Sequence, residues 1–434
     1  MDPDRSRPAA APFWREALAN SAWLSADRLI RGLVNLAVLV CLGRFLGPEL
    51  YGLYSYAIAF VVVFTAFGSL AHEGILVREL VKGGRPQEST LGSAFLLRGI
   101  GGLAGMAGAI GAAWLLPGAR SGLGLIAIIS AGLLFQPFDV VDHWFQSRLQ
   151  ARHAAWVRIG AALPVGACKI ALALRLATLP ALAWMSVAEA LLVAMGLLGM
   201  YWRNGPPGRW RIDGGEVRTL LRDSAPMAAT TLLAMAFMKL DQIMLARFVG
   251  FRELGIYASA VRLVDIWNFI PMAVMPSLYP AVVAMRKRDE GGYARFLLRI
   301  LLAFHALALG VALVNALAGK ALLGLLFGAE YVGAAPALAI LSVATVFHYS
   351  SSIRAQWILI EHKVSYHLGS AAIGVATLAA LNWALIPRWG FLGAAIATVA
   401  GYAASGYGTS LAFRALRPIG RLQTRAFLFR WRIP

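Results

Sequence analysis

Apolar runs of about 20 residues recur along the whole chain, separated by short polar segments. A helix of that length crosses the hydrocarbon core of a bilayer. The runs lack the short alternating strands that are typical of a membrane β-barrel. The pattern therefore predicts an all-α polytopic membrane protein with about twelve transmembrane helices. The predicted spans are residues 21–43, 53–76, 90–116, 122–147, 155–176, 180–202, 225–248, 256–284, 294–317, 334–359, 366–386 and 391–413.

One segment occurs twice in altered form. Residues 42–57 read LGRFLGPELYGLYSYA, and residues 245–260 read LARFVGFRELGIYASA. The copies begin 203 residues apart, close to half of the 434-residue chain. Shared positions include Arg44/Arg247, Gly47/Gly250, Gly52/Gly255 and Tyr54/Tyr257. We therefore interpret the chain as two copies of one six-helix unit. Because Arg44 and Arg247 fall beside glycine turns, we expect them to be structural.

The longest connection between spans sets the predicted boundary between the two units. It covers residues 203–224 and reads RNGPPGRWRIDGGEVRTLLRDS. The predicted organisation has four parts: an N-terminal six-helix lobe (1–202), a cytoplasmic linker (203–224), a C-terminal six-helix lobe (225–413) and a basic cytoplasmic tail (414–434).

Composition and charge narrow the class of protein. A hydrophobic fraction of 59% with only 14% charged residues excludes a soluble chain of this length. The net charge is +19, and most Lys and Arg near span ends fall on the side that holds both termini. The positive-inside rule assigns that side to the cytoplasm. Both halves then share one orientation, related by an axis along the membrane normal. We expect anionic membrane lipid as a partner and no nucleic acid.

The basic tail has a helical pattern of its own. Residues 414–434 contain six arginines and no acid, and Arg414, Arg417, Arg421 and Arg425 lie near one helical face. This pattern favours an interfacial helix on anionic lipid.

Several ionisable residues lie inside predicted spans, where each costs about 2.5–3.5 kcal/mol on insertion scales. Their positions predict a hydrated, cationic cavity for an anionic cargo such as a diphosphate, because guanidinium groups bind phosphate oxygens well. The competing interpretation is snorkelling and mutual ion pairing. The candidate substrate-binding residues are Arg28, Arg31, Lys239, Arg262 and Arg354. The candidates for ion coupling or structural pairing are Asp139, Asp142, Asp241 and Asp265.

No motif in the sequence indicates an enzyme. The chain has no P-loop, HExxH or GxSxG, and its two cysteines form no metal or disulfide pattern. Asp139, Asp142 and His143 are spaced i, i+3, i+4, which is weak evidence for a metal. We therefore predict a transporter without a catalytic centre, a metal or a cofactor.

The repeated segment also carries a family resemblance. LGRFLGPELYGLYSYAIAF (42–60) and LAHEGILVREL (70–80) resemble the first two spans of the Wzx-type polysaccharide-biosynthesis flippases of the MOP superfamily. KLDQIMLARFVG (239–250) and GIYASAVRLVDIWNFIP (255–271) are similar to their seventh and eighth spans. The resemblance covers most of residues 20–285 in pattern.

This resemblance implies a fold and a function. The implied fold has two pseudo-symmetric six-helix bundles around a central cavity. The implied function is the flipping of an undecaprenyl-diphosphate-linked oligosaccharide to the periplasmic leaflet of the bacterial inner membrane, for O-antigen or exopolysaccharide synthesis. The expected partners are that lipid-linked substrate and the polysaccharide polymerase machinery, and the expected state is a monomer.

Several alternatives stay open. A multidrug and toxin extrusion antiporter also has twelve spans, but it pairs organic cations with acidic cavities. Lipid II flippases usually have two further spans. Sugar transporters of the major facilitator class carry a loop motif that VRELVKGGRPQEST lacks. A membrane-embedded glycosyltransferase needs sizeable outer loops with acidic or His residues, and the predicted outer loops are short.

Overall fold

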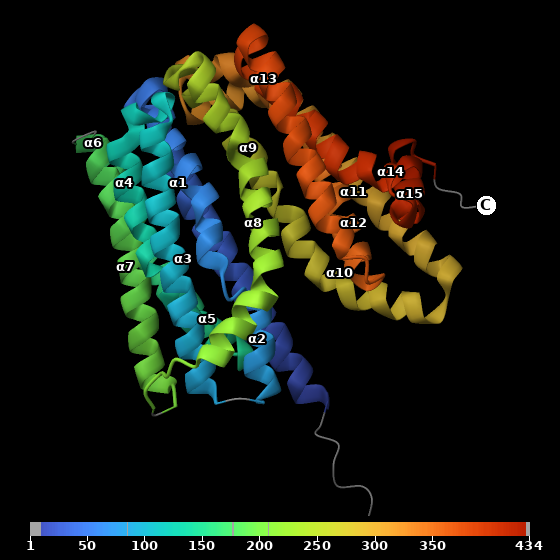
Figure 1. The fold of residues 1–434 in the computed structure, drawn as a ribbon. Coiled ribbons are helices and arrows are strands. Elements are labelled where there is room, and N and C mark those ends of the chain that lie inside the picture. Colours follow the sequence, from blue (N-terminus) through green and yellow to red (C-terminus); the bar gives the residue numbers. More distant parts are fainter. Residues whose placement is uncertain (1–9, 85, 176–177, 207, 431–434) are drawn as a thin grey trace, which may run out of the picture. The chain divides into compact units, whose positions relative to one another are not determined.

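The computed structural model describes residues 10–84, 86–175, 178–206 and 208–430 (Figure 1). Across these residues the chain is almost entirely helical and contains no strand. The helices of the first half are α1 (Ala10–Phe64), α2 (Glu73–Lys82), α3 (Gln87–Leu115), α4 (Leu123–Ala131), α5 (Asp139–Ser147), α6 (Ala151–Arg175) and α7 (Leu179–Asn204). The 3-10 segments among them are Thr65–Ser69, Pro117–Gly122 and Gly132–Phe138.

The described residues of the second half are also helical. Its α-helices are α8 (Gly214–Val249), α9 (Phe251–Trp267), α10 (Phe269–Arg288), α11 (Glu290–Leu326), α12 (Ala335–Ile360), α13 (Ser365–Tyr402), α14 (Thr409–Ala412) and α15 (Arg417–Phe427). Ala329–Ala334 and Arg414–Leu416 are 3-10 segments, and Ala403–Gly408 is a π-helical turn. The last four residues of the predicted tail, 431–434, lie outside the described residues.

Eight helical stretches among the described residues are long and apolar enough to cross a membrane. Ala19–Lys82 contains the first two predicted spans, and Ser365–Ala412 contains the last two. The predicted spans 225–248 and 256–284 lie in α8 and in α9–α10, which are not among the eight. The chain is a multi-pass helical membrane protein, so this prediction of fold class is confirmed.

The chain forms two compact units that interleave along the sequence. The first unit comprises Met1–Leu39, Phe64–Leu115 and Leu123–Ala228. In it α6 packs along α7, and α3 packs along α4 (Figure 1). Its core holds a chain of aromatic rings: Trp144 and Tyr201 have ring centroids 5.1 Å apart, and Tyr201 and Trp210 have centroids 5.4 Å apart. Trp144 and Tyr201 are buried members of a hydrophobic cluster in the first unit, and Trp210 packs against it.

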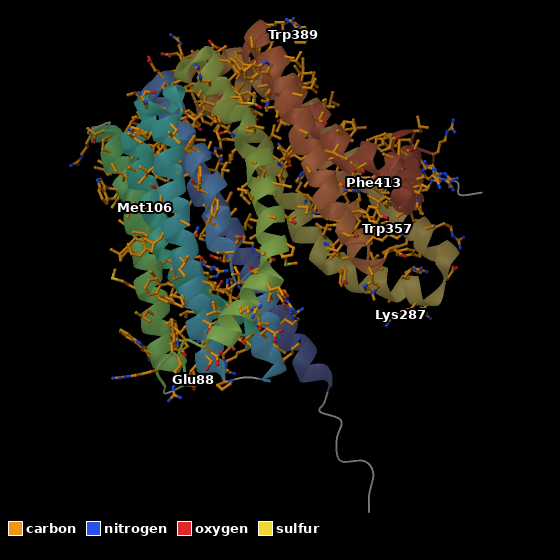
Figure 2. The ribbon with its side chains drawn as sticks, viewed as in Figure 1. Glu88, Met106, Lys287, Trp357, Trp389 and Phe413 are labelled. Carbon is orange, nitrogen blue, oxygen red and sulfur yellow. The ribbon has the colours of Figure 1, made fainter. Side chains whose placement is uncertain are left out.

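The second unit comprises Val40–Val63, Leu116–Gly122 and Ala229–Pro434. In it α12 lies against both α11 and α13 (Figure 1). The helix α13 contains Gly390 with φ 54°, which makes the turn between the last two predicted spans. Trp389 lies at that end of the unit, and Lys287 lies at the opposite end (Figure 2). Exposed tryptophan side chains and cations at helix ends are both typical of membrane interfaces.

The sequence repeat forms a reciprocal contact inside the second unit. Gly47 (φ 72°) and Gly250 (φ 94°) occupy the left-handed region, and a helix begins after each. A Cβ atom on Gly52 would overlap the carbonyl oxygen of Phe251, and a Cβ atom on Gly255 would overlap the carbonyl oxygen of Pro48. Since these contacts map onto each other by the 203-residue offset, the two copies cross in a two-fold manner.

Both repeated arginines stand beside this crossing. Arg44 donates to the carbonyl oxygen of Leu325 at 2.8 Å, and Tyr331 donates to the carbonyl oxygen of Gly43 at 2.6 Å. The side chain of Arg247 lies against Gly118. The contacts of Arg44 and Gly43 tie the segment Val40–Val63 to the second unit, although this segment lies in the first half of the sequence.

Candidate functional site

Two helices of the second unit carry the charges of the seventh and eighth predicted spans. Lys239 and Asp241 lie on α8, in a segment rich in Ala, Leu and Met that favours helix. Arg262 and Asp265 lie on α9, three residues apart and therefore on one helical face. Arg262 Nη1 and Asp265 Oδ2 are 3.6 Å apart, so this pair is an ion pair within one helix.

Asp241 is buried and is held by neutral donors. The Tyr257 hydroxyl donates to Asp241 Oδ2 at 2.6 Å, and the backbone N–H of Gln242 donates to Oδ1 at 2.7 Å. The Thr398 hydroxyl lies 3.4 Å from the same Oδ2 atom. The carboxylate is thus fixed by α9 and α13 without a cation within ion-pair distance among the residues that the structure describes.

Lys239, Asp241, Asp265 and Thr398 border a small cavity of about 50 Å³. The polar side chains at its wall are those of Lys239, Asp241, Asp265, Asn268, Thr345, His348, Thr398 and Tyr402. Apolar residues of α8, α9 and α12 complete the wall.

Lys239 is the distinctive member of this wall. Its side chain is 8% exposed. In the described part of the chain, no carboxylate oxygen lies within 4.0 Å of its ammonium nitrogen and no acceptor lies within hydrogen-bond distance of it. A buried ammonium without an ion-pair partner costs free energy, because the ion has left water without a counter-charge in direct contact. The cavity wall therefore holds an ammonium group that an anionic ligand could pair with, beside the carboxylates of Asp241 and Asp265.

The first unit has a different arrangement, in which Arg158 on α6 lies within 4.0 Å of three carboxylates. Its Nη2 donates to Asp142 Oδ2 at 2.6 Å. Its Nη1 lies 3.7 Å from Asp27 Oδ2, and its Nη2 lies 4.0 Å from Asp139 Oδ1. Asp142 also accepts a hydrogen bond from Gln146 at 2.9 Å.

Two further arginines complete this network. Arg31 binds Asp27 one helical turn away, with Nε 2.7 Å from Oδ1. Arg98 lies 3.9 Å from Asp139 and 3.0 Å from His143 Nε2. The network therefore holds three arginines and three aspartates, so its formal charges balance.

The remaining predicted site residues stand apart from both groups. Arg28 is exposed on α1. Arg354 on α12 is only 3% exposed and donates to the hydroxyls of Ser370 and Thr409. It does not border the cavity described above. Two other charged residues inside predicted spans, Lys169 on α6 and Glu189 on α7, pair with each other at 3.1 Å.

Sequence reasoning missed several members of these sites. Asp27 precedes Arg31 by four residues, a spacing that already predicts an ion pair on a helix. Arg158 falls inside the predicted span 155–176 and lies on α6, but its carboxylate partners come from other helices, so no local spacing indicates them. Nothing in the local sequence around Tyr257 or Thr398 indicates that either contacts Asp241, because those contacts join different helices.

The sequence of this chain is similar to those of known membrane proteins. Residues 17–286 match the sequence model of the polysaccharide biosynthesis protein family. The chain is 30% identical over 192 residues to the probable flippase AglR of Haloferax volcanii, covering 43% of this chain and 39% of that protein. It is 29% identical over 168 residues to an uncharacterized membrane protein of Methanocaldococcus jannaschii, covering 38% and 32%. The matches thus span about a third to two fifths of these curated relatives.

Solved structures show the same fold at low sequence identity. The lipid II flippase MurJ in an inward closed conformation has a TM-score of 0.72 at 12% identity, covering 94% of this chain and 91% of that chain. An inward-facing multidrug resistance MATE transporter of the MOP superfamily has a TM-score of 0.69 at 15% identity, covering 91% and 96%. A MOP superfamily transporter from Pyrococcus furiosus has a TM-score of 0.60 at 14% identity, covering 95% of each chain. The fold is therefore of the MOP type.

Proposed function

The chain belongs to the polysaccharide biosynthesis protein family, and on that premise we propose that it is a flippase for a lipid-linked oligosaccharide. The proposed cargo is an undecaprenyl-diphosphate-linked oligosaccharide, which moves to the periplasmic leaflet by alternating access for surface polysaccharide synthesis. The proposed location is the bacterial cytoplasmic membrane, with both termini in the cytoplasm. In this role the protein moves its substrate and catalyses no covalent step.

The observation that carries the proposal is the cavity of the second unit with Lys239 at its wall. A diphosphate is a compact anion that an ammonium group binds as a point charge. Lys239 has no competing carboxylate within ion-pair distance among the described residues, so its charge is available to a cargo. Arg262 lies on the neighbouring helix α9, where Asp265 shares its charge.

The other predicted site residues differ in how readily they could contact a cargo or couple an ion. Arg28 and Arg31 stay candidates for cargo contact on α1, and Arg31 would have to share its guanidinium with Asp27. Arg354 would have to leave the hydroxyls of Ser370 and Thr409 to reach a cargo. For ion coupling we favour Asp241 over Asp139 and Asp142, because arginines already neutralise the latter two.

A deletion strain tests the proposed function. Loss of the gene is expected to remove surface polysaccharide and to leave lipid-linked repeat units on the cytoplasmic leaflet. Export is measured as surface polysaccharide, and the leaflet is assigned by accessibility of the sugars to an impermeant lectin on spheroplasts. Complementation with the wild-type chain is the control. Normal surface polysaccharide in a strain without any other flippase gene of this class would overturn the proposal.

A multidrug extrusion antiporter is the second candidate, and one observation favours it. Asp241 and Asp265 both border the cavity, and carboxylates suit an organic cation. The two candidates separate in one measurement. If the protein is an antiporter, the deletion strain should be hypersensitive to cationic dyes and keep its surface polysaccharide. If it is a flippase, the strain should lose surface polysaccharide and keep its resistance to these dyes.

A further inference from the structure

The helix α15 is docked on the protein along its apolar face. Ile419, Leu422 and Ala426 are buried in the same cluster as Leu301, Tyr349 and Trp357. The neighbouring side chains of Trp357 and Phe413 belong to this region of the second unit (Figure 2). An amphipathic helix on a bilayer would place that face in lipid. Here protein covers it, so only the opposite face is left for a partner.

Polar contacts fix the helix in this orientation. Gln423, which is fully buried, donates to the Ser350 hydroxyl at 3.0 Å. The hydroxyls of Tyr407 and Thr424 are 2.9 Å apart. The ring of Phe427 lies 4.6 Å from that of His305, centroid to centroid. The helix is therefore held by specific contacts as well as by apolar burial.

The outward face of α15 is cationic. Arg414, Arg417 and Arg421 are exposed, and none of them has a carboxylate within ion-pair distance in the described residues. Exposed apolar side chains flank them, with Leu411 at 41%, Leu428 at 57% and Phe429 at 49% exposure. Cations interleaved with exposed apolar groups are typical of segments at the boundary between headgroups and acyl chains.

The sequence from residue 362 onward supplies no acidic residue that could neutralise this cationic face. The last acidic residue of the sequence is Glu361, which Arg286 binds at 2.8 Å. Lys363, close to Glu361 in the sequence, adds a further cation and donates to the carbonyl oxygen of Ala415 at 2.8 Å. A surplus of this kind attracts an anionic surface.

We propose that Arg414, Arg417 and Arg421 form a binding surface for anionic phospholipid headgroups. The helix α15 starts five residues after the membrane-spanning stretch Ser365–Ala412 ends, which keeps its arginines close to that end of the span. Guanidinium groups bind lipid phosphate in bidentate fashion. The bound lipid would clamp α15 and the α11–α12 pair beneath it. This proposal does not depend on the cargo proposed above.

The test uses the purified full-length chain in a neutral detergent. Phosphatidylglycerol is titrated in, and the thermal midpoint is followed; phosphatidylcholine and inorganic phosphate are titrated in parallel. The substituted chain loses three exposed charges through Arg414→Gln, Arg417→Gln and Arg421→Gln. The control chain loses three exposed charges elsewhere through Arg203→Gln, Arg209→Gln and Arg218→Gln.

We expect phosphatidylglycerol alone to raise the midpoint of the wild-type chain. The α15 variant should need at least about tenfold more of this lipid for the same shift, whereas the control variant should match the wild type. Replacing the same three arginines by lysine should retain most of the effect, which separates loss of charge from misfolding. An unchanged α15 variant, equal loss in both variants, or an equal response to phosphatidylcholine or inorganic phosphate would overturn the proposal.

Discussion

The charges buried in the first unit and those around the cavity of the second unit are of the same types, but their surroundings differ. In the first unit Arg158 lies within 4.0 Å of Asp27, Asp139 and Asp142. In the second unit Lys239 has no such partner among the described residues, and Asp241 is held by neutral donors. A closed set of ion pairs supports structure, whereas an isolated ammonium in a cavity suits ligand binding.

This difference has an energetic basis. A buried ion pair adds little net stability, but removing one partner leaves the other charged and desolvated. Removing a buried charge that has no partner leaves nothing behind and relieves a desolvation cost. The two units should therefore respond in opposite ways when their cations are removed, and the following variants are ordered by their expected effect on stability.

Arg158→Met should have the largest effect. It leaves Asp142 and Asp27 without their shared cation, and we expect a loss of about 3–5 kcal/mol, seen as a sharply lower thermal midpoint in detergent. Arg152→Met, at an exposed position on the same helix α6, is the control. If both variants had equal midpoints, the first unit would not depend on its ion pairs.

Tyr257→Phe should have the next largest effect. It removes the hydroxyl that donates to Asp241 at 2.6 Å and leaves a buried carboxylate oxygen with a weaker set of donors. The expected loss of stability is about 1–3 kcal/mol, measured by the same thermal assay. Tyr279→Phe, which is on α10 and exposed, should be close to neutral. A neutral Tyr257→Phe would mean that Asp241 is not stabilised by this bond.

Arg31→Ala should have a small effect on stability. The Arg31 side chain is 38% exposed, and Asp27 keeps Arg158 at 3.7 Å, so we expect a loss of at most about 1 kcal/mol. As a proposed cargo contact, the variant should insert into the membrane and lose export of polysaccharide. Full export would restrict Arg31 to its pairing role.

Lys239→Gln should not reduce stability, and it tests the difference between the two units most directly. Since no carboxylate lies within ion-pair distance of its ammonium among the described residues, the thermal midpoint should stay constant or rise slightly. Export in the complemented deletion strain should fall at least about tenfold, which corresponds to 1.4 kcal/mol of lost cargo interaction. Lys320→Gln, at an exposed position on α11, should keep both properties. A sharp drop in the midpoint would show that Lys239 is paired after all.

The sequence predicted those features that depend on neighbours along the chain. The apolar runs determine the helices, because only a helix satisfies its own backbone in lipid. The repeated glycines, including Gly52 and Gly255, could be recognised from the 203-residue offset. Ion pairs one turn apart, such as Arg262 with Asp265, follow from helical spacing.

Tertiary structure alone decided which charges are paired and which are not. Arg158 reaches Asp27 across 131 residues, Tyr257 on α9 reaches Asp241 on α8, and Lys239 is left without a partner. The sequence contains all of these groups but not the packing that sets their distances. It also shows that α15 is amphipathic, whereas only the fold reveals that protein covers its apolar face. The physical reason is that electrostatic free energy depends on separation and burial, and helix packing fixes both.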